Sequence, residues 1–135
     1  QPPEAAPSQR RLGAHRMCLT AGLDVTDLHR IATVEEGRLA AADIARLGLD
    51  GVIAAADNLA AGIVSALPSC GKNVPRDVAV VGYDNLLIAR LAQPPLTTID
   101  QGLGEKVRLI IAMIKQRKPG SIHLIEPNLV VRESA

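Results

Sequence analysis

The chain has almost no aromatic side chains: its 135 residues include one tyrosine, no phenylalanine and no tryptophan. The core must therefore be built from aliphatic side chains, which supply most of the 47% of residues that are hydrophobic. Cores of this kind are typical of parallel strands buried between helices. The length is that of one ordinary domain.

Cysteine and histidine are scarce as well. The two cysteines, Cys18 and Cys70, form neither a Cys-x-x-Cys pair nor a disulfide framework, so we expect reduced thiols and a cytoplasmic protein. The histidines, His15, His29 and His123, lack the spacing of metal ligands. We therefore expect neither a metal nor another cofactor.

An excess of one charge and long apolar runs are also absent. The formal net charge is +1, and basic residues are scattered, so nothing marks a nucleic-acid-binding surface on this chain. No apolar run reaches the about 18 residues that a membrane helix needs, and we expect no membrane contact. Residues 1–7 are rich in proline and alanine and are expected to form a linker or a frayed end.

Helical and strand patterns alternate along the rest of the chain. Thr33 and Glu36 have the spacing of a capping box, and Gly48 is a stop signal, which together predict a helix at Val34–Leu47. The other expected elements are a helix at Arg10–Thr20 ended by Gly22, a strand at Gly51–Ala56, a helix at Asn58–Leu67 capped by Asp57, a strand at Val78–Gly82, a helical or irregular segment at Leu86–Ala92, an extended segment at Leu96–Ile99, a helix from Leu103 to Ile114, a turn at Pro119-Gly120, and strands at Ile122–Ile125 and Leu129–Val131. This order predicts an α/β fold whose mainly parallel sheet has helices on both faces.

The most informative stretch is Val80-Val-Gly-Tyr-Asp84-Asn85, which reads as the end of a buried strand followed by a turn. Ligands of open α/β sheets bind at the carboxyl ends of strands, and Asp84 would lie at such an end. The chain then returns through Pro94-Pro-Leu-Thr-Thr-Ile99. These two blocks resemble the effector-sensing core of the lac-repressor family of bacterial transcription regulators.

Three further blocks follow the order found in that family, so the resemblance extends from about residue 8 to residue 132. They are Arg10-Arg-Leu-Gly13, the stretch from Asp50 to Gly62, and Leu129-Val-Val-Arg-Glu-Ser134. In the family, two α/β lobes joined by crossovers enclose the effector. The resemblance implies a periplasmic-binding-protein-like carboxyl-terminal lobe at 8–95, a crossover at 96–101, and at 102–135 the helix and strands of the amino-terminal lobe. The family's helix-turn-helix head would be missing from this chain. Binding to operator DNA would therefore depend on that missing head.

The resemblance also implies an effector site made of Arg10, Asp84 and Gln101. A carboxylate accepts strong hydrogen bonds from vicinal hydroxyls, and the planar fork of arginine suits hydroxyls or carboxylates. The alternatives are a turn or capping aspartate, a solvated helix arginine and an ordinary loop glutamine. Asp57 is expected to cap its helix, with direct ligand contact as the second interpretation.

Two departures from the family concern the effector. Ala56 stands where the family often has an asparagine that binds sugar hydroxyls, and no aromatic residue lies near Ala32 or Thr33. Rings and amides are common tools of sugar recognition. We expect a sugar-like or other small polar metabolite, and the departures favour a smaller or less polar molecule, or a degraded pocket, over a simple hexose.

A homodimer is the expected assembly, because the helix Asn58–Leu67 and the segment Leu91–Ala92 match the family's dimer surface. Small side chains there permit close approach of helices, and the alternative is packing within the domain alone. The residues expected to face the partner subunit are Asn58, Ala61, Ser65, Leu91 and Ala92.

The sequence thus predicts the effector-sensing, dimerising portion of a lac-repressor-type regulator. An enzyme is not expected, because the chain has neither a Gly-x-Ser-x-Gly setting nor a glycine-rich phosphate loop. The alternative function is a periplasmic solute-binding protein of the same two-lobe architecture, which a secretory leader in the gene would favour.

One apolar stripe has no expected partner within the chain. Its members have the spacing of one helix face: Leu103, Val107, Ile110, Ile111 and Ile114. In the family this helix packs on the lobe that is mostly missing. We therefore expect self-association through the stripe, or an unusual packing of this helix.

Overall fold

The computed structural model describes residues 9–116 and 122–135, and its centre is a four-stranded sheet in the order β1-β2-β3-β4. The strands are β1 (Gly51–Ile53), β2 (Ala79–Tyr83), β3 (Thr97–Asp100) and β4 (Asn128–Val130). The first three are parallel, and β4 is antiparallel to β3. The predicted α/β fold with a mainly parallel sheet is confirmed.

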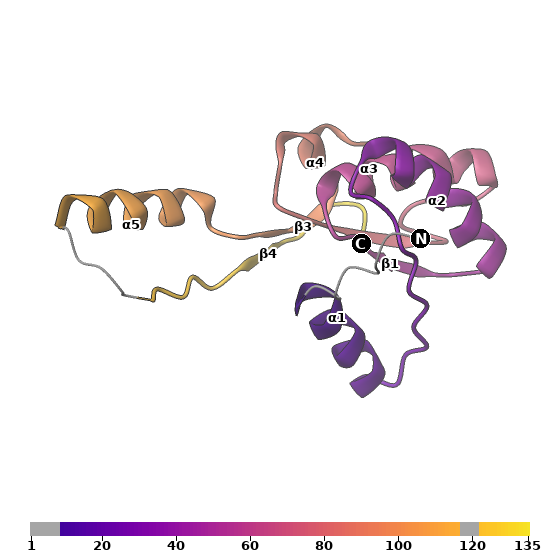
Figure 1. The fold of residues 1–135 in the computed structure, drawn as a ribbon. Coiled ribbons are helices and arrows are strands. Elements are labelled where there is room, and N and C mark those ends of the chain that lie inside the picture. Colours follow the sequence, from indigo (N-terminus) through magenta and orange to yellow (C-terminus); the bar gives the residue numbers. More distant parts are fainter. Residues whose placement is uncertain (1–8, 117–121) are drawn as a thin grey trace, which may run out of the picture.

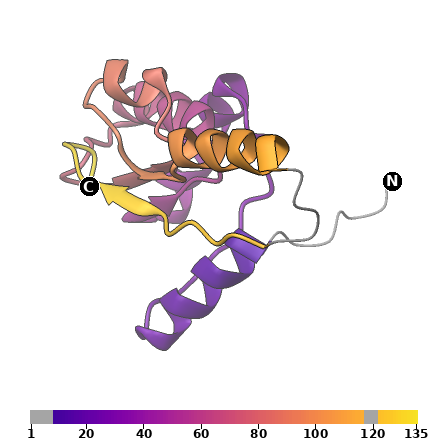
Figure 2. The ribbon, with the colours of Figure 1, turned by 90° about the vertical axis from the view of Figure 1, so that its left-hand side faces the viewer.

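The helices lie on both sides of this sheet. They are α1 (Gln9–Thr20), α2 (Val34–Leu47), α3 (Asp57–Ala66), the short 3-10 helix η1 (Leu67–Cys70), α4 (Leu87–Leu91) and α5 (Leu103–Gln116). In Figure 1, α2, α3 and α4 lie above the sheet, α1 lies below it, and α5 stands apart at the left. None of the residues of α1 is buried, and Figure 2 shows this helix projecting below the sheet, so the lower face of the sheet is only loosely covered.

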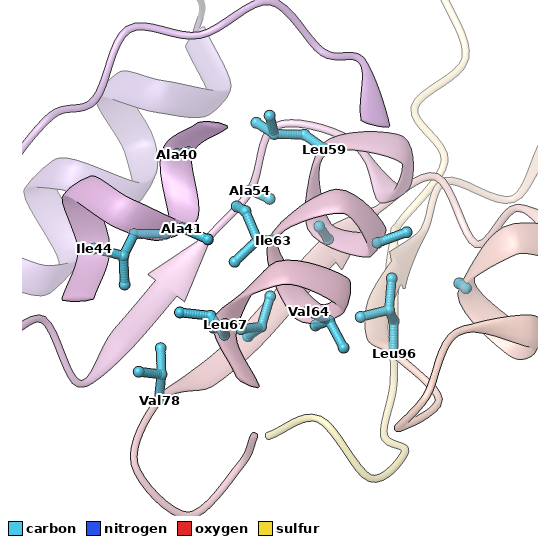
Figure 3. Packing of buried hydrophobic residues seen from close by; sticks show 14 residues of the cluster. Ala40, Ala41, Ile44, Ala54, Leu59, Ile63, Val64, Leu67, Val78 and Leu96 are labelled. Atoms are coloured by element: carbon cyan, nitrogen blue, oxygen red, sulfur yellow. The ribbon is translucent and has the colours of Figure 1, made fainter. Parts of the chain in front are cut away.

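The core fills the space between the sheet and the pair α2 and α3 (Figure 3). It consists of small and aliphatic side chains, as the shortage of aromatics requires: Ala40, Ala41, Ile44, Ala54, Leu59, Ala60, Ala61, Ile63, Val64, Leu67, Val78, Val80, Ala89 and Leu96. The two helices approach each other through glycines. An added Cβ atom at Gly62 would lie 2.0 Å from the backbone oxygen of Val34, and one at Gly37 would lie 2.2 Å from that of Leu59.

Local signals placed α2 correctly. The side chain of Thr33 accepts a hydrogen bond from the backbone N–H of Glu36 at 3.2 Å, as a capping box requires. Gly48 ends the helix with φ 66°, and Gly22 takes the same left-handed conformation with φ 75° after α1. The bounds of α2 are the predicted ones.

Three expectations about individual elements were wrong. Ala56, and not Asp57, is the N-cap of α3, because the Asp57 carboxylate is engaged elsewhere. The strand expected at Gly51–Ala56 ends at Ile53. Ile53 is 58% exposed, because β1 is an edge strand and one face of the sheet is only loosely covered. Ile122–Ile125 forms no strand; pairing with β3 begins only at Asn128. The linker expected at 1–7 and the turn at Pro119-Gly120 lie outside the described residues.

The apolar stripe of α5 lies in the open. No residue of this helix is buried, and Leu103 and Ile114 are 68% and 71% exposed. Among the described residues, the alternative of an unusual intramolecular packing is therefore not found, and self-association remains the prediction.

We expect the purified chain to associate in a concentration-dependent manner through α5. Substituting Ile110→Glu together with Ile114→Glu should weaken this association at least about tenfold, because each buried isoleucine contributes roughly 1.5–3 kcal/mol. Sedimentation velocity over a concentration series measures the effect. Lys115→Glu, an exposed change on the same helix, is the matched control. A monodisperse monomer at all concentrations would contradict the prediction.

Candidate functional site

The three residues predicted for the effector site lie at one edge of the sheet. Asp84 directly follows β2 and Gln101 directly follows β3, and the carboxyl ends of parallel strands meet at the same edge. The Gln101 side-chain amide donates a hydrogen bond to Oδ1 of Asp84. Both side chains are half-buried, so they remain within reach of a ligand.

Arg10 approaches this edge from the first turn of α1. Its guanidinium carbon lies 4.5 Å from the ring centre of Tyr83, the neighbour of Asp84. Its Nη1 atom lies 3.5 Å from the backbone oxygen of Ala55, just beyond the end of β1. Arg10 therefore lies near the ends of β1 and β2. Among the three predicted residues, the direct contact is between Asp84 and Gln101.

The backbone at this edge has an unusual conformation. Asp84 has φ 105° and Asn85 has φ 52°, in the left-handed region that non-glycine residues seldom adopt. The Asp84 N–H donates to the backbone oxygen of Ile99 at 2.9 Å, and the Asn85 N–H donates to the Thr98 hydroxyl at 3.4 Å. Such conformations persist where the surroundings hold them, and they gather at ligand-binding sites.

Asp57 supports the turn from below. Its side chain is fully buried and accepts hydrogen bonds from the Thr98 hydroxyl at 2.6 Å and from the Leu86 N–H at 2.7 Å. Gly82 makes room for it, since an added Cβ there would lie 2.2 Å from Oδ1 of Asp57. Burial and these two bonds give Asp57 a supporting role, and leave the interpretation of direct ligand contact without structural support.

A second group of polar residues was missed by the sequence reasoning. The Asn85 side chain donates to Oδ2 of Asp100 at 2.9 Å and accepts from Nη2 of Arg132 at 2.8 Å. Nη1 of Arg132 donates to the backbone oxygen of Leu96 at 2.7 Å, which ties the end of the chain to the start of β3. Asn85 stands beside Asp84 in the most informative motif, and that position was the available signal.

Asp100 accepts two hydrogen bonds at this edge. Besides Asn85, it accepts a hydrogen bond from the Gly102 N–H at 2.7 Å. The bond from Asn85, then that from Gly102, and the nearby positive charge of Lys106 hold the pKa of Asp100 below its ordinary value. Asp100 is therefore ionised at neutral pH, with its acceptors directed at the protein.

Lys106, on the first turn of α5, was also missed. Its half-buried ammonium group donates to Oε1 of Gln101 at 3.0 Å. Gln101 thus bridges Lys106 and Asp84. The positions that depart from the family pattern carry no comparable group: Ala56 has only a methyl, and the Thr33 hydroxyl is used by the cap of α2.

The residues predicted for the dimer surface lie on α3 and α4, which pack together. Leu91 is 67% exposed, and Ser65 is exposed with its hydroxyl donating to the backbone oxygen of Gly62 at 2.8 Å. Asn58 and Ala92 are half-buried, and Ala61 is only 8% exposed, since it belongs to the core. The interface remains a prediction, in which Leu91 would supply most of the free apolar surface.

Residues 9–116 and 122–135 contain neither a metal site nor a disulfide. Within these ranges, no cluster of three or more histidine, cysteine, aspartate or glutamate side chains could hold a metal ion. Cys18 and Cys70 are both free thiols. In the same described ranges, no helix combines the length and apolar character that crossing a membrane requires.

The four-stranded sheet with helices on both faces is the architecture of a periplasmic-binding-protein-like domain, and the family model described as periplasmic binding protein-like domain matches residues 1–135. The chain belongs to this family. Among curated relatives, the HTH-type transcriptional regulator CelR of Thermobifida fusca is 38% identical over 91 residues, which are 64% of this chain and 27% of CelR.

Solved structures agree with this assignment. A LacI family transcriptional regulator from Arthrobacter sp. FB24, in complex with lactose, matches with a TM-score of 0.84 and 30% identity, over 96% of this chain and 51% of that one. A complex of the regulator CelR with cellobiose matches with a TM-score of 0.74 and 30% identity, over 97% of this chain and 45% of that one. The chain thus spans about half of these structures and about a quarter of its curated relative CelR.

Proposed function

We propose that this chain is the carboxyl-terminal portion of the effector-sensing core of a LacI-type transcription regulator, and that Arg10, Asp84 and Gln101 contact the effector. The observation that carries the proposal is the direct contact of Asp84 and Gln101 at the carboxyl ends of β2 and β3, with Arg10 over the ring of Tyr83, the neighbour of Asp84. The lactose and cellobiose complexes of its relatives support a small polar effector.

The proposed division of labour follows the predicted boundaries. Residues 8–95 form the carboxyl-terminal lobe, 96–101 cross over, and 102–135 belong to the other lobe. The separation of α5 from the helices above the sheet supports this division (Figure 1). Asp84 lies in the carboxyl-terminal lobe and Gln101 is the last residue of the crossover, so a ligand that they bind would be sensitive to the relative orientation of the two lobes.

The proposed mechanism is allosteric and requires no enzymatic chemistry. An effector shifts the orientation of the lobes only if it binds one arrangement more tightly than the other. Subunits would associate through α3 and α4, and operator DNA would be bound in the cytoplasm by a head outside this chain. The similarity to transcription regulators favours this function over a periplasmic solute-binding protein.

We expect Asp84→Ala to weaken effector binding by about 10- to 100-fold, because hydrogen bonds to a charged group contribute roughly 1.5–3 kcal/mol each. Titrations of the ¹⁵N-labelled chain by NMR, with lactose, cellobiose, glucose and gluconate as probes, report binding down to millimolar affinity. Asp50→Asn is the matched control, since Asp50 is exposed and precedes β1 at the opposite edge. Asp50→Asn should bind as the unchanged chain does, and binding that is equally unchanged in Asp84→Ala would refute the proposed site.

A further inference from the structure

The positive charges at the ligand-facing edge are only partly compensated. Lys106 is half-buried, and its ammonium group, which has three donors, makes one hydrogen bond to the described part of the chain. That bond goes to a neutral amide oxygen of Gln101. Asp100 attracts Lys106 electrostatically but accepts its hydrogen bonds from Asn85 and Gly102.

A cation that is partly removed from water and paired with a neutral group favours a negative ligand group beside it. Lys106 lies next to Gln101, which is bonded to Asp84, so a ligand bound to Asp84 would come within reach of the ammonium. Arg10 adds a second cation at the same edge. The side-chain donors that Lys106 and Arg10 present at this edge are therefore positively charged.

The usual means of binding a neutral sugar are reduced in this chain. Stacking needs an exposed aromatic face, and the only aromatic side chain, Tyr83, has Arg10 over its ring at 4.5 Å. Ala56 provides no side-chain hydrogen bond at the end of β1. A neutral hexose would therefore be bound here by polar side chains, such as those of Asp84, Gln101 and Arg10, without a stacking ring.

We propose that the effector of this protein is a polyhydroxylated molecule with an acid group, either a carboxylate or a phosphate, and that Lys106 binds this group while Asp84 accepts bonds from its hydroxyls. This proposal rests on the proposed function, since it names the ligand class of the same site. Lys106 is the residue that determines specificity. A lysine binds either acid group as a compact point charge.

The test uses glucose, gluconate and glucose 6-phosphate, which share a carbon chain and differ in the acid group. We expect at least one of the two acids to bind the ¹⁵N-labelled chain at least tenfold more tightly than glucose, and their ratio distinguishes carboxylate from phosphate. Lys106→Met should reduce this preference to less than twofold. Lys115→Met, on the exposed last turn of α5, should retain it.

Two different failures can be told apart. If glucose binds as tightly as both acids and Lys106→Met changes nothing, while Asp84→Ala still weakens binding, the acidic effector is refuted and the proposed function stands. If none of the probes shifts the resonances of Asp84, Asn85 or Gln101, the site itself is refuted.

Discussion

Substituting Gly62→Ala is expected to destabilise the folded chain by about 2–3 kcal/mol, because it overpacks the close crossing of α2 and α3. The new Cβ would lie 2.0 Å from the backbone oxygen and 2.9 Å from the backbone carbon of Val34, and 3.0 Å from the backbone nitrogen of Arg38. These are backbone atoms of α2, so no rotation of a side chain can relieve the clash. The helices must move apart, which opens the core that they share.

The sign of this effect separates packing from helix propensity. Alanine is favoured over glycine in a helix by about 1 kcal/mol, so propensity alone predicts that Gly62→Ala would stabilise α3. Gly13→Ala is the matched control, because Gly13 lies in α1 with no atom within 4 Å of an added Cβ. Urea denaturation followed by circular dichroism should show a lower midpoint for Gly62→Ala and no decrease for Gly13→Ala. Equal midpoints for both variants would contradict the close crossing.

Substituting Asp57→Ala should cost about 2–5 kcal/mol of folding stability and should also impair ligand binding. The carboxylate is fully buried and accepts from the Thr98 hydroxyl and the Leu86 N–H. Its loss leaves the buried Thr98 hydroxyl and the part-buried Leu86 N–H without this partner, at roughly 1–3 kcal/mol each. The Thr98 hydroxyl also accepts a hydrogen bond from the Asn85 N–H, so removing Asp57 also weakens the support of the turn that carries Asp84.

A second variant distinguishes lost hydrogen bonds from a lost side chain. Asp57→Asn keeps the shape and one acceptor oxygen, so it should be less destabilising than Asp57→Ala. Asp50→Ala, an exposed change, should stay within about 0.5 kcal/mol of the unchanged chain. The measurements are urea denaturation and the ¹⁵N shifts of Asn85 and Leu86. Unaltered shifts in Asp57→Ala would show that Asp57 does not hold the turn.

Features governed by neighbouring residues could be predicted from the sequence. The bounds of α2 followed from Thr33, Glu36 and Gly48, because caps and left-handed stops are settled within one turn of backbone. The exposed face of α5 followed from the spacing of its isoleucines. The resemblance to the lac-repressor family placed Asp84 and Gln101 in one predicted site, and the structure brings them together directly after parallel strands.

Long-range partners were decided only by the tertiary structure. Asp57 looked like a helix cap, but its carboxylate bonds to Thr98 and Leu86, which are 41 and 29 residues away in sequence. Arg132 bonds to Asn85 across 47 residues. Even the hydrogen bond from Lys106 to Gln101, only five residues away, depends on the direction in which α5 leaves the sheet. A buried polar group takes whichever partner packing brings within reach, and a one-dimensional pattern does not contain that information.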